Sequence, residues 1–250
     1  GNKINENTQF RLGSFSKFIT GLAVDRLVQD SSNILDYNTQ LCNVFSKQEL
    51  NLMFDSNEYD FVSKITLQQL IDQRSGIDNM GAPDLQADFK LVLSEEELKS
   101  PVTSELLRQS KKIRLKLKDG FSHQKPRFNY SNLNATLVGA IMERVTGKPF
   151  QKIMQECIFE PFGLRDTGYD SPEITQKPYA KSFNLPINPE TRENTFSDSN
   201  FFDPSSHIWT SPKDMSTLFS KLSSNLLLTQ ALRSTLSQDG SGPNYRHFSI

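Results

Sequence analysis

Apolar residues recur at intervals of three and four over long parts of the chain, which is the spacing of one face of an α-helix. The widest of these stripes lies in residues 14–30 and consists of Phe18, Ile19, Leu22, Ala23, Leu27 and Val28. A stripe of this width predicts a helix at the centre of the fold. Similar stripes predict helices over residues 132–147, 149–161 and 211–222.

Weaker patterns predict shorter elements between these helices. We expect an extended piece at 10–12 and helices at 66–72, 94–99, 103–110 and 229–237. Residues 111–118 alternate basic and apolar side chains, which favours a strand with one solvated face over a basic binding patch. We expect residues 36–60 to form a polar loop, 169–204 to form loops with short strands, and 245–250 to begin a strand.

The chain has 250 residues and a net charge of −1, and its length fits one domain spanning residues 1–250. Proteins that bind nucleic acid carry a basic balance or stripe, so no nucleic-acid partner is expected. No apolar run reaches the ~20 residues of a membrane-spanning helix, and the polar residues 1–9 do not resemble a signal sequence. His123, His207 and His247 lack the spacing of metal ligands, so no metal site is expected.

The first chemical signal is Ser14, which stands three residues before Lys17 at the start of the central helix. Residues at this spacing share one helical face, so the pair places a hydroxyl beside an amine. A serine hydroxyl becomes an effective nucleophile when a base removes its proton, and a lysine shielded from water can be that base. Ser122 and Lys125 repeat the spacing in a polar loop, so the pattern alone leaves open a serine that only caps a helix.

The second signal is Tyr130-Ser131-Asn132, the only Tyr-x-Asn in the sequence, at the start of the predicted helix 132–147. The Tyr130 hydroxyl can relay protons. Asn132 offers an amide donor and an acceptor, which suits holding either a substrate amide or Lys17. The alternatives are an amphipathic core tyrosine and an asparagine that caps the helix.

These residues resemble those of a known family. Residues 10–17 are similar to the first motif of class C β-lactamases and their relatives in the penicillin-binding family, the D-alanyl-D-alanine carboxypeptidases and the β-lactamase-fold esterases. Tyr130-Ser131-Asn132 resembles the second motif of the family. The runs 137–150 and 158–167 continue the similarity.

The resemblance implies an α+β fold of the β-lactamase/transpeptidase type, with a helical lobe and an antiparallel sheet. It also implies a serine hydrolase that uses no cofactor and acts on a small-molecule or peptide substrate. In that reading Ser14 is the acylated nucleophile, Lys17 the proton acceptor, Tyr130 the acid and base, and Asn132 a ligand of the substrate. The resemblance slightly favours an exported protein, either periplasmic or extracellular.

The sequence also departs from the family pattern. The third motif, Lys or His followed by Ser or Thr and then Gly, does not occur between Asn132 and Ile250. Residues 73–77 stand where relatives usually carry His-Thr-Ser-Gly-Leu, and residues 204–211 predict an altered rim of the cleft. The long separation of Ser14 and Tyr130 predicts an insertion within 80–120, and we expect strands of the sheet to be missing at both ends.

Two hypotheses follow from this pattern. The first is a serine hydrolase that forms an acyl-enzyme on an amide or ester. Tyr-Ser-Asn in place of Tyr-Ala-Asn favours a peptidase or esterase over a dedicated β-lactamase. The alternative is a catalytically inactive scaffold for binding or assembly, favoured by the missing third motif and by the altered residues 73–77 and 205–209. A third motif downstream would exclude it. Oligomeric state stays open.

Overall fold

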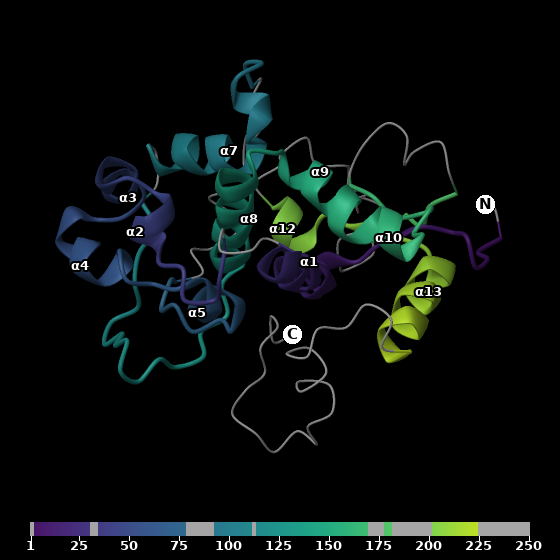
Figure 1. Ribbon diagram of the computed structural model, residues 1–250, viewed down its shortest axis with the longest axis horizontal. Helices are drawn as coiled ribbons and strands as arrows, with labels where there is room; N and C mark the ends of the chain where they lie inside the picture. The colour runs from purple at the N-terminus through teal and green to yellow at the C-terminus, as the bar shows by residue number, and fades with distance from the viewer. Residues whose placement is uncertain are drawn as a thin grey trace, which may run out of the picture.

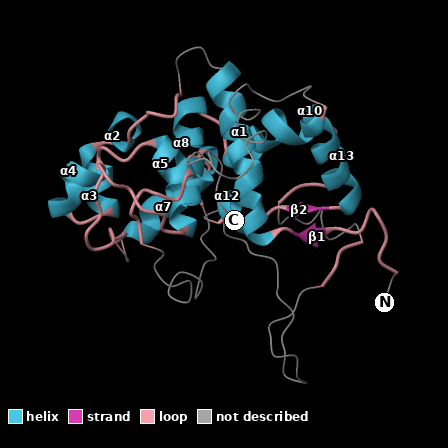
Figure 2. Cartoon of the chain, turned by 90° about the horizontal axis from the view of Figure 1, so that it is seen from below, coloured by secondary structure: helices cyan, strands magenta, loops and turns pink. Residues whose placement is uncertain are grey.

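The computed structural model describes residues 3–30, 35–78, 93–111, 114–169, 178–181 and 202–224. Helices make up most of these ranges, and a small antiparallel sheet lies at one side (Figures 1 and 2). The main elements are β1 (Phe10–Arg11), α1 (Ser16–Asp30), α2 (Leu41–Val44), α3 (Lys47–Met53), α4 (Tyr59–Val62), α5 (Leu67–Ile71), α7 (Pro101–Ser110), α8 (Asn132–Thr146), α9 (Phe150–Met154), α10 (Glu160–Phe162), α12 (Asp203–Ser206), β2 (Trp209–Thr210) and α13 (Pro212–Ser223). Three 3-10 helices, η1 (Gly13–Phe15), η2 (Ser56–Glu58) and η3 (Glu97–Lys99), and one π-helix, η4 (Gln155–Phe159), complete these ranges.

Helices α1 and α8 form the centre of the fold, as Figure 1 shows. Helix α8 packs against α1, α5, α7, α9 and α12, so its apolar side chains, among them Leu133, Leu137 and Ile141, are buried. Helix α1 buries the stripe that contains Ile19 and Leu22. The central helix predicted over 14–30 and the helix predicted over 132–147 are therefore confirmed.

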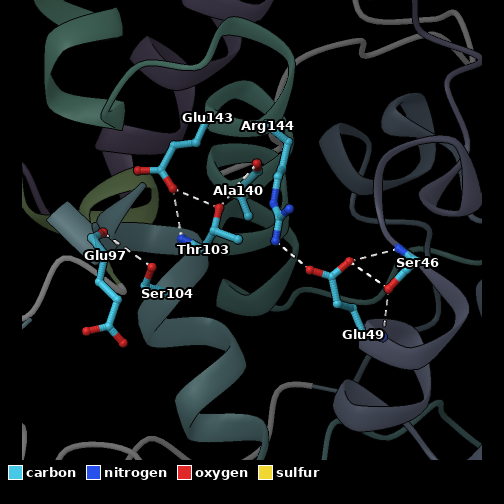
Figure 3. Close-up of polar contacts among 8 residues, drawn as sticks. All are labelled: Ser46, Glu49, Glu97, Thr103, Ser104, Ala140, Glu143 and Arg144. Carbon is cyan, nitrogen blue, oxygen red and sulfur yellow. Dashed lines mark hydrogen bonds and ion pairs between the residues drawn. The ribbon is translucent and has the colours of Figure 1, made fainter. Parts of the chain in front are cut away.

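A buried carboxylate joins three helices around this core. Glu143 of α8 accepts hydrogen bonds from the N–H groups of Val102 and Thr103 at the start of α7 (3.2 and 2.8 Å) and of Phe150 at the start of α9 (3.0 Å). The Thr103 hydroxyl donates to the same carboxylate (Figure 3). Because the first N–H groups of a helix have no partner within it, one side chain caps two helices.

The sheet described here consists of β1 and β2, which pair antiparallel with Phe10 opposite Thr210 and Arg11 opposite Trp209. Figure 2 shows this pair at the side of the helical body, next to α13. The Arg11 guanidinium lies over the Trp209 ring at 5.1 Å. The extended piece predicted at 10–12 is therefore confirmed, and β1 leads directly into the turn that carries Ser14.

The prediction of a polar loop over 36–60 is wrong, because α2, α3 and the start of α4 occupy much of this range. The signal for α3 is Ser46 with Glu49, which form a reciprocal capping box: the Ser46 N–H donates to the carboxylate and the Glu49 N–H to the hydroxyl. Leu50 and Met53 of this helix are buried. Glu49 also pairs with Arg144 of α8 (Figure 3), which fixes α3 against the core.

The stretch from 94 to 118 differs in part from its prediction. Residues 94–99 hold only the 3-10 turn η3, and α7 begins at Pro101 rather than at Thr103, since Glu143 caps it. Residues 114–118 alternate in burial as expected, but Leu115 and Leu117 form only isolated bridges, with Phe54 and Ile77. They do not form a strand, and residues 112–113 lie outside the described ranges.

The later helices largely follow their predictions. Thr66 caps α5 and Ser211 caps α13, while Gly147 and Gly163 end helices in the left-handed conformation. The helix predicted over 149–161 contains the π-helix η4 and continues to Phe162, one residue beyond Pro161, where Gly163 ends it. The elements predicted at 229–237 and 245–250 lie outside the described residues. Most of 169–204 and part of the suspected insertion within 80–120 also lie outside them. The single domain over 1–250 stays a prediction.

Candidate active site

Ser14 lies at an exposed turn between the sheet and the central helix. Pairing of β1 with β2 and the hydrogen bond from the Leu12 N–H to the Ile208 carbonyl (2.8 Å) fix the chain before it. Gly13 adopts a φ of +55°, which glycine tolerates far better than other residues. The chain then turns through η1 into α1, so Ser14 stands where the N-terminal N–H groups of a helix favour negative charge.

Lys17 lies in the first turn of α1 and is only 1% exposed. Its Nζ donates to Ser14 Oγ (3.3 Å) and to the Ser205 carbonyl (3.0 Å), and it lies 4.9 Å from the centre of the Tyr130 ring. Burial disfavours the charged amine and lowers the pKa of Lys17 from 10.5 to about 8. The amine is therefore close to its titration range at neutral pH.

Tyr130 contacts Ser14 although the two residues are 116 positions apart in the sequence. Its hydroxyl donates to Ser14 Oγ (2.8 Å) and lies 3.4 Å from Asn132 Oδ1. The phenol stands on the residues just before α8, the helix that Asn132 begins. The structure therefore brings together Ser14, Lys17, Tyr130 and Asn132, the four site residues predicted from the two motifs, and places two proton-carrying groups on one serine oxygen.

The sequence did not identify Ser205, whose carbonyl holds Lys17. This carbonyl belongs to α12, which is fixed to α1 by the Thr20 hydroxyl donating to the Pro204 carbonyl (2.9 Å). The Ile208 N–H donates to the Ser16 hydroxyl (3.2 Å). Residues 204–211, expected as an altered rim, are buried for the most part and pack beneath the nucleophile. A backbone carbonyl leaves no signature in the side chains, although Asp203-Pro204 could have indicated a helix start.

The arrangement can move protons around one hydroxyl. A neutral Lys17 can accept the Ser14 proton, while the Tyr130 hydroxyl can donate to a group that leaves from the attacked carbon. Both contacts are within hydrogen-bond reach of the same oxygen.

Comparison with known proteins identifies the family. A model of the Beta-lactamase family matches residues 1–250. The chain belongs to this family. The chain is also similar to two curated proteins. Protein flp of Staphylococcus aureus (strain COL) is 27% identical over 217 residues, which cover 85% of this chain and 38% of flp. Esterase EstB of Burkholderia gladioli is 29% identical over 184 residues, which cover 72% of this chain and 43% of EstB.

A solved structure supports the same fold. The penicillin binding protein from Bacillus halodurans superposes with a TM-score of 0.68 at 20% identity, over 98% of this chain and 69% of that one. The expected α+β β-lactamase/transpeptidase-like fold, with a helical lobe and a small antiparallel sheet, is confirmed. The chain spans only about two fifths of the length of the curated relatives it matches.

Other groups in this β-lactamase-family chain have structural contacts. His207 is buried and pairs with Asp203 (3.1 Å), and His123 contacts the Phe61 carbonyl (2.8 Å); His247 lies outside the described residues. Within the described ranges no three His, Cys, Asp or Glu side chains are grouped so as to hold a metal ion. No helix in the same ranges is long and apolar enough to cross a membrane.

Proposed function

We propose that this chain carries the nucleophilic machinery of a serine hydrolase that forms an acyl-enzyme through Ser14. The observation that supports this most strongly is that Ser14 Oγ lies within hydrogen-bond distance of both Lys17 Nζ (3.3 Å) and Tyr130 Oη (2.8 Å). Membership of the Beta-lactamase family is consistent with it.

In the proposed reaction Ser14 Oγ attacks the carbonyl carbon of an amide or ester, and its proton passes to neutral Lys17. Tyr130 gives its own proton to the leaving nitrogen or oxygen as the C–N or C–O bond breaks. Transfer of the first proton from Lys17 to Tyr130 restores both groups. Water then attacks the Ser14 ester, and its proton returns to Ser14 Oγ as the acid leaves. Asn132, beside Tyr130, is the proposed ligand of the substrate amide.

Labelling with a fluorophosphonate probe tests the proposal by intact-mass spectrometry. We expect one adduct on the wild type and none on Ser14→Ala, because the probe reacts with an activated serine. Lys17→Ala and Tyr130→Phe should each lower the labelling rate by about 10²–10⁴, the range for loss of general acid–base help.

Ser122→Ala is the matched control, because Ser122 and Lys125 repeat the spacing of Ser14 and Lys17 in a loop. It should label like the wild type. An unlabelled wild type, or equal labelling of Ser14→Ala, would exclude the proposed nucleophile.

The second candidate is an inactive scaffold for binding or assembly. It is favoured by the absence of a Lys/His-Ser/Thr-Gly triplet between Asn132 and Ile250. Because the chain spans 38% of Protein flp, sequence from the same gene decides this point directly. A triplet on a downstream strand supports the hydrolase, and a complete gene without one supports the scaffold.

The substrate class can be tested by comparing turnover rates on a panel of p-nitrophenyl esters, a D-alanyl-D-alanine peptide and nitrocefin. We propose an ester or peptide in preference to a β-lactam. The Tyr-Ser-Asn motif supports this order, as does the name of the relative Esterase EstB. Faster turnover of nitrocefin than of every ester and peptide in the panel would reverse it.

A further inference from the structure

The turn that follows α5 contains Gln73, a residue in an unusual backbone conformation. The N–H groups of Gln73 and Arg74 turn back to the carbonyls of Leu70 (3.2 Å) and Gln69 (2.8 Å), the pattern of a Schellman motif. Its left-handed position is usually glycine. Here it is Gln73, with a φ of +56°, and no other residue except glycine has a positive φ in the described part of the chain. Backbone conformations of this kind cluster at functional sites.

Gln73 binds the backbone on both sides of Tyr130. Its carbonyl accepts the N–H of Asn129 (2.7 Å), and its side-chain Oε1 accepts the N–H of Ser131 (2.8 Å). Oε1 also accepts from Asn134 Nδ2 in the first turn of α8 (2.7 Å). The N–H groups of the two residues that flank the tyrosine therefore both donate to Gln73, two residues beyond the end of α5, and α5 packs against α8.

Neighbouring contacts hold this clamp, the pair of hydrogen bonds from Asn129 and Ser131 to Gln73, in place. The Ser75 hydroxyl donates to Asn134 Oδ1 (2.6 Å), and Asn129 Nδ2 donates to the Ile77 carbonyl (2.8 Å). Gln73 is fully buried, and its Nε2 has no hydrogen-bond partner among the described residues. An unpaired buried donor is unfavourable, so the side chain is suited to this place by its oxygen rather than by its nitrogen.

We propose that Gln73 is a positioning residue for Tyr130: it holds the N–H groups of Asn129 and Ser131, the residues on either side of the tyrosine, so that the phenol meets Ser14 Oγ. The inference rests on the proposed acid–base role of Tyr130. Residues 73–77 are also the segment whose departure from the family pattern favoured an inactive scaffold. The contacts of Gln73 instead make this segment a support of the motif at residues 130–132.

A double-mutant cycle tests this role. Gln73→Met keeps the length and approximate volume of the side chain and removes the oxygen. Displacement of a catalytic group by about 1 Å can cost about 10²-fold in rate, so we expect a loss of that order in Ser14 labelling by the fluorophosphonate probe. In the Tyr130→Phe background Gln73→Met should cost less than about threefold, since there is no phenol left to position. An equal loss in both backgrounds would show a general structural effect and overturn the inference.

Two further variants separate positioning from loss of stability. Gln73→Glu keeps an oxygen at the same point and should recover most of the labelling rate. Gln69→Met makes the same substitution on α5, where it removes the acceptor Oε1 of the capping bond donated by the Thr66 N–H, and should leave the rate unchanged. The proposal would be contradicted by two results together. Gln73→Glu would fail to restore the labelling rate, and Gln69→Met would lower that rate as much as Gln73→Met does.

Amide hydrogen exchange keeps the test independent of activity. The Ser131 N–H, which donates to Gln73 Oε1, should exchange faster in Gln73→Met than in the wild type and Gln69→Met. An unlabelled wild type would exclude the proposed function of Ser14. Unchanged exchange of the Ser131 N–H in Gln73→Met would exclude the proposed role of Gln73. The two failures are thus distinguishable.

Discussion

Lys17 combines two properties that seldom occur together in a lysine: it is almost fully buried, and its amine contacts a serine hydroxyl. With a pKa of about 8, roughly one molecule in ten carries the neutral amine at pH 7. Only the neutral form can accept a proton from Ser14. The contact with Ser14 is therefore chemically useful because Lys17 is buried.

This charge state predicts how Ser14 labelling depends on pH. Because a pKa lowered by burial leaves Lys17 protonated below about pH 8, the labelling rate should rise about tenfold per pH unit below that value and level off above it. Rates measured by mass spectrometry from about pH 6 to 9.5 check this. Lys17→Arg keeps a fixed positive charge, so its rate should be low and flat, and a bend near pH 8 in that variant would assign the titration to another group.

At the scale of residues, the sequence predicted the parts of the candidate site that consist of side chains in a recognisable motif. Ser14 with Lys17, and Tyr130 with Asn132, each stand at the start of a helix with a recognisable spacing. The Ser205 carbonyl was missed because every residue has one. The burial of Lys17 was missed as well, since it depends on α12, a segment far away in the sequence.

At the scale of elements, Glu143 shows how α7, α8 and α9 are held together. Glu143→Ala leaves the buried N–H groups of Val102, Thr103 and Phe150 without their acceptor. Each unsatisfied buried donor costs about 1–3 kcal/mol, so we expect the free energy of unfolding to fall by on the order of 4 kcal/mol. Urea denaturation followed by circular dichroism measures it.

Arg144→Ala is the control, since Arg144 follows Glu143 on the same helix but pairs with Glu49 at the surface, as Figure 3 shows. A partly exposed ion pair contributes about 1 kcal/mol or less. Equal losses for Glu143→Ala and Arg144→Ala would show that the capping of α7 and α9 contributes little.

The prediction of elements succeeded where one face of a helix is apolar over several turns, as in α1 and α8. It failed for α3, whose capping box at Ser46 was present in the sequence but not recognised. It also did not show the π-helix η4, which lies just before Pro161. A proline lacks the N–H of a regular helix, but a change in hydrogen-bond pattern just before it is not visible in apolar spacing.

At the scale of the whole molecule, α8 and α12 touch at one glycine. A Cβ on Gly139 would lie 2.4 Å from Cγ of Pro204, and a proline ring cannot rotate aside. Gly139→Ala should therefore push α12 away, lower the free energy of unfolding by about 1–3 kcal/mol, and slow Ser14 labelling because the carbonyl of Ser205 moves with α12. Thermal unfolding and probe labelling of the same sample measure both effects.

Gly147→Ala offers a matched comparison on the same helix. Gly147 has a φ of +67° and open space around it, so alanine costs about 1–2 kcal/mol through the backbone and touches nothing at the site. If both variants slow labelling to the same degree, stability alone explains the effect and α12 has no separate influence on Lys17.

The overall fold could be predicted because the two motifs and the runs beside them resemble one family, and that resemblance brings a complete architecture with it. The packing of α12 against α1 could not be predicted, since it depends on hydrogen bonds between the Ser16 and Thr20 hydroxyls and distant backbone groups: Ser16 accepts from the Ile208 N–H, and Thr20 donates to the Pro204 carbonyl. Apolar spacing identifies helices, but it does not say which helix a polar residue faces.

The bond between Lys17 and the Ser205 carbonyl joins residues 188 positions apart. The entropy of closing so long a loop must be lost before the contact contributes any stability, so contacts of this kind are slow to form during folding. During synthesis the ribosome releases Lys17 long before Ser205. The growing chain therefore has its serine and lysine early, but it acquires their final geometry only after it has been made as far as Ser205.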